Sequence, residues 1–479
     1  MSELPIRRID DELWEIPASA RPDMRVPARV FADFELLSAI QRDRSLEQLA
    51  NVATLPGIVQ ASLAMPDIHQ GYGFPVGGVG ATELPDGVVS PGGVGYDINC
   101  GVRLLAFPLD ATELGDLREP LVHEISRRVP VGAGGKGSRA GIRGARLERV
   151  LAEGPRALLE DLGIGSDEEL SYTESGGRLG DADPAAVSAR ARQRGSGQLG
   201  TLGSGNHFLE LQRVDRIYAA AAAEAYGLRE GQVTLLIHSG SRGLGHQVCT
   251  DFVKRMDASL RRYGIELPDR QLSCAPIDSA DGRDYLAAMA AAANFAWANR
   301  AGIAHRAREA IATVIGRDCA ARTRTVYDVA HNVAKLERHA GRELCVHRKG
   351  ATRAFPPGHS ELPPAYHDAG QPVFIPGSMG TASFVLAGRA GSMERSFGTT
   401  CHGAGRRLSR TAVRKQVQGA SLRRRLEDAG IAVRAASSRG LAEEAPEAYK
   451  DVERVVEVVE RARLAARVAR LRPIGVVKG

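Results

Sequence analysis

The stretch Gly92-Gly93-Val94-Gly95-Tyr96-Asp97-Ile98-Asn99-Cys100-Gly101 places one carboxylate and one thiol in a loop that is dense in glycine. Asp97 and Cys100 are three positions apart, so a single turn can direct both side chains toward one point. Carboxylate and thiolate together favour a divalent metal, and a thiolate can bridge two ions. Cys100 as a buried structural cysteine is the alternative, and glycine on both sides of its loop argues against it.

Three histidines farther along the chain share a polar, turn-prone setting: His207, His238 and His331. We expect a buried strand over 233–238 that ends on His238 and a strand over 327–330 that runs into His331. Any one such histidine is more often structural than a ligand. As a set with Asp97 and Cys100, and with Asp67 and His69 in similar surroundings, they predict a metal centre. The neighbours Asn206 and Asn332 are candidates to bind phosphate oxygens or to orient a ligand.

A second cluster is Cys401-His402-Gly403-Ala404-Gly405-Arg406-Arg407. We expect a helix over 405–428, whose N-terminus would offer free N–H groups to an anion. An imidazole at this entry can attack phosphorus and carry the group covalently. A plain glycine-rich helix start is the alternative. From Arg406 to Arg425 the chain has eight Lys or Arg and no acid, which suits either a solvated helix face or a phosphate-binding track.

Two further features are weaker indications of a binding site. The segment 376–381, Pro-Gly-Ser-Met-Gly-Thr, follows an expected strand and is either a phosphate-contacting turn or an ordinary β-turn. Lys478 is next to last in the chain, and terminal residues usually fray. The tail 473–479 is mostly apolar, however, which favours a docked end.

Length and composition indicate a large globular chain. Its 479 residues suggest about three domains by length alone, yet no linker divides them. The 54 glycines are spread throughout, and 43% of the residues are hydrophobic, which excludes disorder. A net charge of +6 permits a polyanionic partner without requiring one. Strands and helices mix without regular alternation, so we predict a single large irregular α+β domain over 1–479, with a central metal and nucleotide pocket.

The expected elements follow from periodicity and turn residues. Helices are expected at 45–52, 113–128, 146–162, 214–226, 245–263, 281–315, 405–428 and 449–471. Strands are expected at 76–81, 87–90, 102–107, 208–212, 233–238, 327–330, 344–347, 372–375 and 382–386. The first 55 residues read as a short ordered lead-in, and 131–143 as a mobile glycine-rich basic loop.

Several classes of protein lack support. The six cysteines form no CxxC pair, the N-terminus lacks an apolar targeting segment, and no apolar run reaches ~18 residues. We therefore expect a reduced, cytoplasmic protein without a membrane span. The chain has no GxxxxGK[ST], GxSxG or HExxH motif, so P-loop NTPase, α/β-hydrolase and zincin interpretations are unsupported.

At these motifs the chain resembles the RNA-splicing ligase RtcB family. The matching stretches occur in family order along nearly the whole chain. They are 65–71 (MPDIHQG), 92–101, 200–208 (GTLGSGNHF), 238–245 (HSGSRGLG), 329–332 (VAHN), 377–380 (GSMG), 402–406 (HGAGR) and 475–479 (GVVKG).

The resemblance implies a ligase that joins RNA ends bearing a 3′-phosphate or 2′,3′-cyclic phosphate to 5′-hydroxyl ends, with GTP and two Mn²⁺ ions. It implies that Cys100 bridges both metals, with Asp97 and His207 at one and His238 and His331 at the other. His402 would be the nucleophile that becomes guanylylated. The residues expected to hold GTP or its guanylate are Asn206, His207, Glu210, Asn332, Ser378, Ala404, Gly405, Arg406, Arg410, Tyr449 and Lys478, with Lys478 reading the guanine.

The implied pathway is chemically coherent. The His402 imidazole takes GMP from GTP, passes it to the RNA 3′-phosphate to give an RNA-(3′)pp(5′)G intermediate, and the 5′-hydroxyl then expels GMP. A dinuclear phosphatase or nuclease would explain the metal donors but leaves His402 and Lys478 without a role. An RNA-binding protein with structural metals is a further alternative. Three questions stay open: whether the substrate RNA belongs to tRNA splicing or to RNA repair, whether archease is needed, and which of Mn²⁺, Co²⁺ and Zn²⁺ is bound. A monomer is the default expectation.

Overall fold

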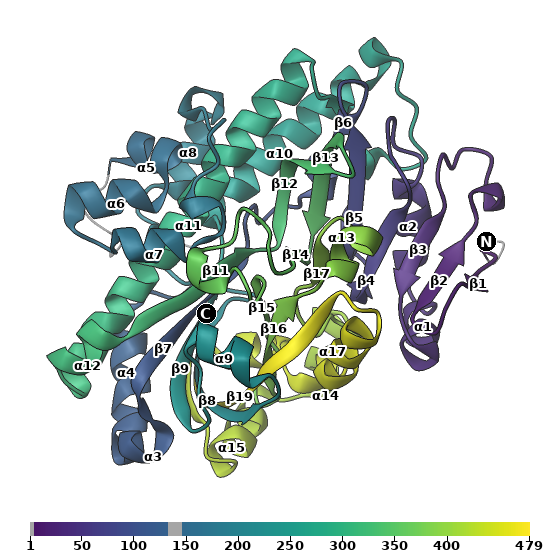
Figure 1. Ribbon diagram of the computed structural model, residues 1–479. Helices are drawn as coiled ribbons and strands as arrows, with labels where there is room; N and C mark the ends of the chain where they lie inside the picture. Colours follow the sequence, from purple (N-terminus) through teal and green to yellow (C-terminus); the bar gives the residue numbers. More distant parts are fainter. Residues whose placement is uncertain (1–3, 133–145) are drawn as a thin grey trace.

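The computed structural model describes residues 4–132 and 146–479, and it contains two large sheets and a layer of helices (Figure 1). One sheet has seven strands in the order β1-β2-β3-β4-β5-β13-β12. Its strands are β1 (Arg7–Arg8), β2 (Leu13–Ile16), β3 (Ala28–Phe31), β4 (Ser62–His69), β5 (Val76–Glu83), β12 (Asn332–His339) and β13 (Arg342–Lys349). The N-terminal strands lie at one end of the molecule, so the first 55 residues are more than the short lead-in that we expected.

The second sheet has eight strands. Its path is β11-β7-β9-β8-β19-β16-β15, and β18 pairs with β19 as a branch. Its strands are β7 (Gly101–Asp110), β8 (Phe208–Ile217), β9 (Gln232–Ser239), β11 (Arg324–Ala330), β15 (Pro372–Ile375), β16 (Ser383–Gly388), β18 (Ala432–Ala435) and β19 (Ala465–Lys478). Two small sheets pair β6 (Val88–Val89) with β10 (Ala275–Pro276), and β14 (Ala351–Arg353) with β17 (Thr399–Cys401). This mixture confirms the predicted α+β class.

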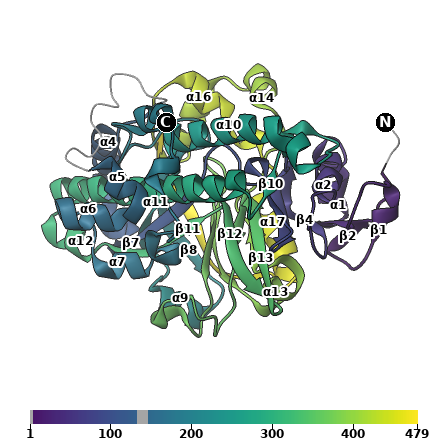
Figure 2. The ribbon, with the colours of Figure 1, turned by 90° about the horizontal axis from the view of Figure 1, so that it is seen from above.

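Helices cover the sheets, and α10 and α11 pack against each other above them (Figure 2). The first helices are α1 (Phe34–Ile40), α2 (Ser45–Val52), α3 (Ala111–Leu114), α4 (Arg118–Arg128), α5 (Leu147–Glu153), α6 (Pro155–Leu162), α7 (Asp167–Ser171), α8 (Ala189–Gly195) and α9 (Ala220–Tyr226). The others are α10 (Arg242–Ser259), α11 (Ala280–Val314), α12 (Arg317–Arg322), α13 (Ala390–Ser396), α14 (Arg410–Gln416), α15 (Gly419–Asp428), α16 (Ser438–Glu443) and α17 (Val452–Arg461).

The 35-residue helix α11 is the central support of the helical layer. Ser279 caps it by accepting a hydrogen bond from the Gly282 N–H group. Its middle is rich in alanine and almost fully buried, from Ala288 to Ala304. Small side chains let other elements approach the helix axis closely, so α11 contributes to two of the hydrophobic cores.

Three expected helices are wrong in part, each because long-range strand pairing or loop contacts prevail over local propensity. Instead of starting a helix at 214, β8 continues to Ile217, where it pairs with Ala469. The expected helix 449–471 is α17 alone, and the chain then forms the 14-residue strand β19 between β8 and β16. The expected helix 405–428 is split into α14 and α15 and begins only at Arg410.

The fold brings the ends of neighbouring strands of the eight-stranded sheet together at one edge. In this antiparallel arrangement Gly101 pairs with both Ala330 and Ser239, and Phe208 pairs with both His238 and Lys478. The residues at or beside these ends therefore gather in one place, although they come from five distant segments.

Most of the expected mobile loop 131–143 lies outside the described residues. Among those that are described, no helix is both long and apolar enough to cross a membrane. The tail predicted to be docked is the end of β19, where the Lys478 side chain is buried.

Candidate active site

Five potential metal donors converge at the shared edge of the strands. Asp97 and Cys100 lie in the turn before β7, where the Cys100 N–H donates to the Asp97 carbonyl (2.9 Å). His207 directly precedes β8, His238 lies near the end of β9, and His331 joins β11 to β12. The sequence predicted these five residues as a set, and the structure brings all of them together.

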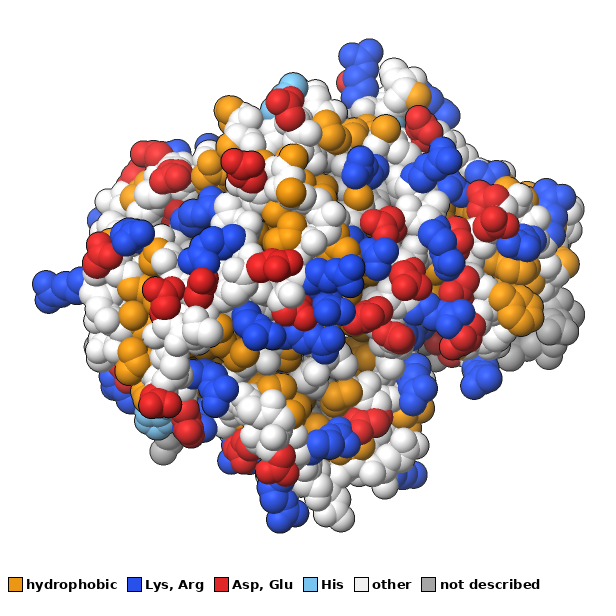
Figure 3. All heavy atoms as spheres, turned by 60° about the horizontal axis from the view of Figure 1, so that its bottom comes forward, with side chains coloured by type: hydrophobic (Ala, Val, Ile, Leu, Met, Phe, Trp, Pro, Cys, Tyr) orange, Lys and Arg blue, Asp and Glu red, His pale blue; other side chains and the backbone are white. Residues whose placement is uncertain are grey.

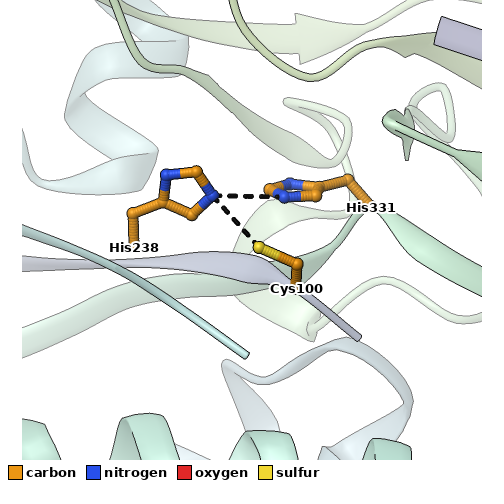
Figure 4. A group of neighbouring side chains, drawn as sticks. All are labelled: Cys100, His238 and His331. Atoms are coloured by element: carbon orange, nitrogen blue, oxygen red, sulfur yellow. Dashed lines mark hydrogen bonds between the residues drawn. The ribbon is translucent and has the colours of Figure 1, made fainter. Parts of the chain in front are cut away.

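The donors form two overlapping groups that share Cys100. Cys100, His238 and His331 form one, and Asp97, Cys100 and His207 form the other, with the donor atoms of each group within 4.8 Å of one another. The Cys100 Sγ lies 3.3 Å from His238 Nε2, which lies 3.3 Å from His331 Nε2 (Figure 4). On the other side, His207 Nε2 is 3.5 Å from the sulfur and 2.7 Å from Asp97 Oδ2.

The electrostatics of this cluster fit a cation. Burial holds the pKa values of His238 and His331 well below the ordinary range, so both imidazoles are neutral and offer lone pairs. Burial, together with the nearby Asp97 carboxylate, raises the pKa of the Cys100 thiol well above its usual value. A divalent ion would reverse that shift by stabilising the thiolate. A thiolate, a carboxylate and imidazoles suit Mn²⁺, Co²⁺ or Zn²⁺.

A buried arginine behind the donors fixes their backbone. Arg300 of α11 donates from Nη1 to the carbonyls of Asn99 (2.8 Å) and Ser239 (2.9 Å). Its Nε donates to Asp328 (2.9 Å), which also accepts from Arg103 (2.8 Å). Arg300 thus ties the Asp97–Cys100 turn to the end of β9, and the charge of Asp328 offsets the burial of both guanidinium groups.

His402 follows β17 and faces the same cavity. Its Nδ1 donates to Asp67 Oδ2 (2.6 Å), and that oxygen also accepts from the N–H groups of His402 (3.1 Å) and Gly403 (3.3 Å). This contact occupies Nδ1, whereas Nε2 makes no hydrogen bond within the described part of the chain. The ring lies 4.9 Å from that of His331, centroid to centroid, so His402 adjoins the donor cluster.

A cavity of about 260 Å³ connects the donor cluster to the C-terminal segment. Most of the expected site residues line it: Asp97, Cys100, Asn206, His238, His331, Asn332, His402, Ala404, Gly405, Arg406, Arg410 and Tyr449. His207, Glu210, Ser378 and Lys478 are not in its lining. His69, which the sequence grouped with the metal candidates, lines the cavity without joining either donor group.

Of the residues outside the lining, Lys478 and Glu210 are fully buried just behind it. The Lys478 ammonium donates to the carbonyls of Gly205 and His207, the latter at 2.8 Å, and burial lowers its pKa to about 8. Glu210 accepts from Gln212 (2.6 Å), and burial raises its pKa to about 8.

Asn332 and Asn206 differ in their freedom to bind a ligand. The Asn332 amide donates to the Asp97 carbonyl (3.0 Å) and accepts from the Gly350 N–H group (2.8 Å), so it braces the Asp97 turn. Asn206 is exposed and lines the cavity, and its side chain makes no hydrogen bond that the described residues show. Asn206 is thus better suited to contact phosphate.

The expected helix N-terminus at Gly405 is wrong. Helix α14 starts at Arg410 with Ser409 as its N-cap. The N–H groups of Arg407 and Leu408 instead donate to the Ala448 carbonyl (2.8 and 3.2 Å), which holds this segment beside Tyr449. Arginine side chains, not a helix dipole, therefore supply the positive charge beside His402.

A sequence model of the family described as "tRNA-splicing ligase RtcB" matches residues 48–479. The chain belongs to the RtcB family. It is 54% identical to the tRNA-splicing ligase RtcB of Thermococcus kodakarensis, over 99% of both chains. It is 52% identical to the protein of that name in Archaeoglobus fulgidus, again over 99% of both chains. The RNA-splicing ligase RtcB of Mycobacterium tuberculosis is 52% identical over 90% of this chain and all of its own.

The sequence did not single out several residues of this RtcB-family site. Glu444, just after α16, accepts from Arg406 Nη1 and Arg410 Nε (both 3.1 Å) and from the Tyr449 hydroxyl. Lys349 also lines the cavity. Nothing near these residues in the sequence marks them, because their partners lie elsewhere in the chain.

The basic run 406–425 is partly neutralised. Arg406 and Arg410 pair with Glu444, Arg414 with Glu443 and Arg425 with Glu447. Across the face in Figure 3, Lys and Arg side chains are interspersed with Asp and Glu. That face presents no continuous field of one sign.

Proposed function

We propose that this chain is a GTP-dependent RNA ligase, acting over residues 1–479 as one unit, which joins 3′-phosphate or 2′,3′-cyclic phosphate ends to 5′-hydroxyl ends in tRNA splicing or RNA repair. One observation carries the proposal. His402, with Nδ1 held by Asp67 and Nε2 free, opens onto the same cavity as two donor groups that share Cys100. A hydrolase would use the donors but has no need of an oriented nucleophilic imidazole beside them.

The metal donors would hold two divalent ions, for which we propose Mn²⁺. Asp97, Cys100 and His207 would bind one, and Cys100, His238 and His331 the other. Bound there, the ions would neutralise charge on phosphate oxygens. Three protein ligands at each ion leave positions open for substrate, which favours catalysis over a structural site.

His402 would act as the nucleophile. Its Nε2 would attack the α-phosphorus of GTP, forming a P–N bond as the P–O bond to pyrophosphate breaks. Asp67 would keep the proton on Nδ1 and balance the positive charge that develops on the ring. The RNA 3′-phosphate would then take GMP from Nε2, and the 5′-hydroxyl would attack that phosphate and release GMP.

The C-terminal segment would hold the nucleotide. Arg406 and Arg410 carry charges that suit phosphate, and Glu444 sets their positions. Glu210 and Lys478 offer an acceptor and a donor that match the edge of guanine. Tyr449 offers an aromatic ring next to Arg406.

Labelling with α-³²P-GTP and Mn²⁺ tests the proposal. Wild type and His402→Ala are incubated, denatured and resolved on a gel. We expect acid-labile label on the wild type and none on the variant. If metal-loaded wild type stays unlabelled, archease is added. Continued absence of label would favour a dinuclear hydrolase and would refute the ligase.

A further inference from the structure

Tyr96, at the metal-donor end of the cavity, and Tyr72, which packs against it, have no part in the proposed chemistry. Tyr96 directly precedes Asp97 and lines the cavity beside it. The Tyr72 ring packs against Tyr96 edge to face, with centroids 5.3 Å apart and planes at 62°. His246, near the start of α10, lies 6.0 Å from Tyr96 with its ring tilted by 35°. We call Tyr72, Tyr96 and His246 the aromatic platform.

The loops that carry the two tyrosines need glycine to hold their shape. Gly73 follows Tyr72 with φ +70°, and Gly95 precedes Tyr96 with φ +94°. A Cβ at Gly73 would lie 2.4 Å from the Gln271 carbonyl oxygen, so that loop is also closely packed. Left-handed backbone on one side of each ring fixes the direction in which the ring leaves its loop.

A single buried ammonium group ties these two loops together. The Lys349 Nζ donates to the Phe74 carbonyl (3.1 Å) and the Gly92 carbonyl (3.2 Å), and also to the carbonyl of Tyr72. The aliphatic part of Lys349 lies against Gly95, the residue before Tyr96. Lys349 therefore fixes the two tyrosine loops relative to each other, and Tyr96 of the platform lines the cavity wall.

The rings are accessible, as a stacking surface requires. Tyr72 and Tyr96 are half-buried, and His246 is exposed. A phenol is ordinarily neutral near pH 7, so neither tyrosine would repel a polyanion, and an aromatic face can stack on any base.

We propose that the aromatic platform stacks on the base of the RNA nucleotide that bears the terminal 3′-phosphate. The inference rests on the function proposed above and adds a subsite to it. That phosphate must stay beside the donor cluster in both RNA steps, first to receive GMP and then to be attacked. Tyr96 is adjacent to the donor Asp97, so it lies where the base of that same nucleotide would extend. The guanylate would rest instead on Tyr449 and Arg410 from the C-terminal segment.

The test compares two RNA oligonucleotides that end in a 3′-phosphate, one with a normal terminal base and one with an abasic terminal nucleotide. Transfer of labelled GMP from preloaded enzyme is measured without any 5′-hydroxyl strand and normalised to the enzyme–GMP present. We expect wild type to favour the normal RNA by about 5- to 150-fold in KM, as one stacked base supplies. Tyr96→Leu should lose this preference, and the matched control Tyr96→Phe should keep it.

Equal KM values for the two RNAs on wild type would overturn the proposal, and this comparison needs no variant that might fail to fold. An undiminished preference in folded Tyr96→Leu would overturn it as well. The wild type could instead discriminate between a normal and an abasic terminal base only on the 5′-hydroxyl strand, in the sealing step. That result would assign the platform to the other RNA end and refute our assignment. Failure of wild type to form enzyme–GMP would refute the proposed function, and this inference with it.

Discussion

Replacing Asp67 by Asn tests how His402 is oriented for attack. The Asp67 Oδ2 lies 2.6 Å from His402 Nδ1 and accepts two backbone N–H groups in addition. The Asn side chain keeps the shape but loses the charge that would balance the imidazole as its P–N bond forms. A hydrogen bond to a charged group contributes about 1.5–3 kcal/mol. We therefore expect formation of enzyme–GMP to slow by about 10- to 150-fold at saturating GTP.

The assay is single-turnover labelling with α-³²P-GTP across a range of GTP concentrations. The GTP dependence should change little, because Asp67 does not line the nucleotide cavity. Asp215→Asn is the matched control, since this carboxylate is paired with Arg470 outside the cavity (3.0 Å) and its loss should leave labelling intact. Thermal melting shows whether each variant is folded. Wild-type labelling rates in folded Asp67→Asn would refute the reasoning.

Three further predictions concern the metal donors, the buried support and the pH dependence. Cys100→Ser should bind fewer than two equivalents of Mn²⁺ in equilibrium dialysis, because both donor groups share its sulfur; unchanged stoichiometry would contradict that sharing. Arg300→Met should lower the free energy of unfolding in urea by about 3–5 kcal/mol, because it leaves Asp328 with one buried partner fewer; an unshifted midpoint would show that Arg300 is dispensable. Lys450 is half-buried, and desolvation lowers its pKa to about 8 from 10.5. Between pH 8 and 10.5 Lys450 therefore holds fewer protons in the folded than in the unfolded state, so its contribution to stability should rise with pH by at most about 1.4 kcal/mol per unit. Lys450→Met should lack this contribution, so its urea midpoint should rise less with pH than that of the wild type, and parallel midpoints for the two proteins from pH 7 to 10 would count against it.

Local sequence patterns correctly predicted those helices and strands whose residue propensities match the environment that the fold gives them. The strand that ends on His238 and the 35-residue helix α11 were both expected, since an apolar run and an alanine-rich stretch have few alternatives. The first half of β19, residues 465–471, was mistaken for the end of a helix, because it is rich in helix-forming Ala and Arg. Two of its neighbours, β8 and β16, come from more than 70 residues away, and their pairing makes the strand favourable. Pairing over that distance leaves no local signal.

By itself, the sequence determined the chemistry that is available: a thiol, a carboxylate and three imidazoles in turn-prone settings, and a histidine followed by arginines. Only the tertiary structure decided which of these groups meet. Strand register brings the donors to one sheet edge, and a contact spanning 335 residues joins Asp67 to His402. Residues such as Glu444 and Tyr96 acquire their neighbours in the same way. Residue type sets what a side chain can do, but distance and burial set what it does, and both arise only when remote segments pack together.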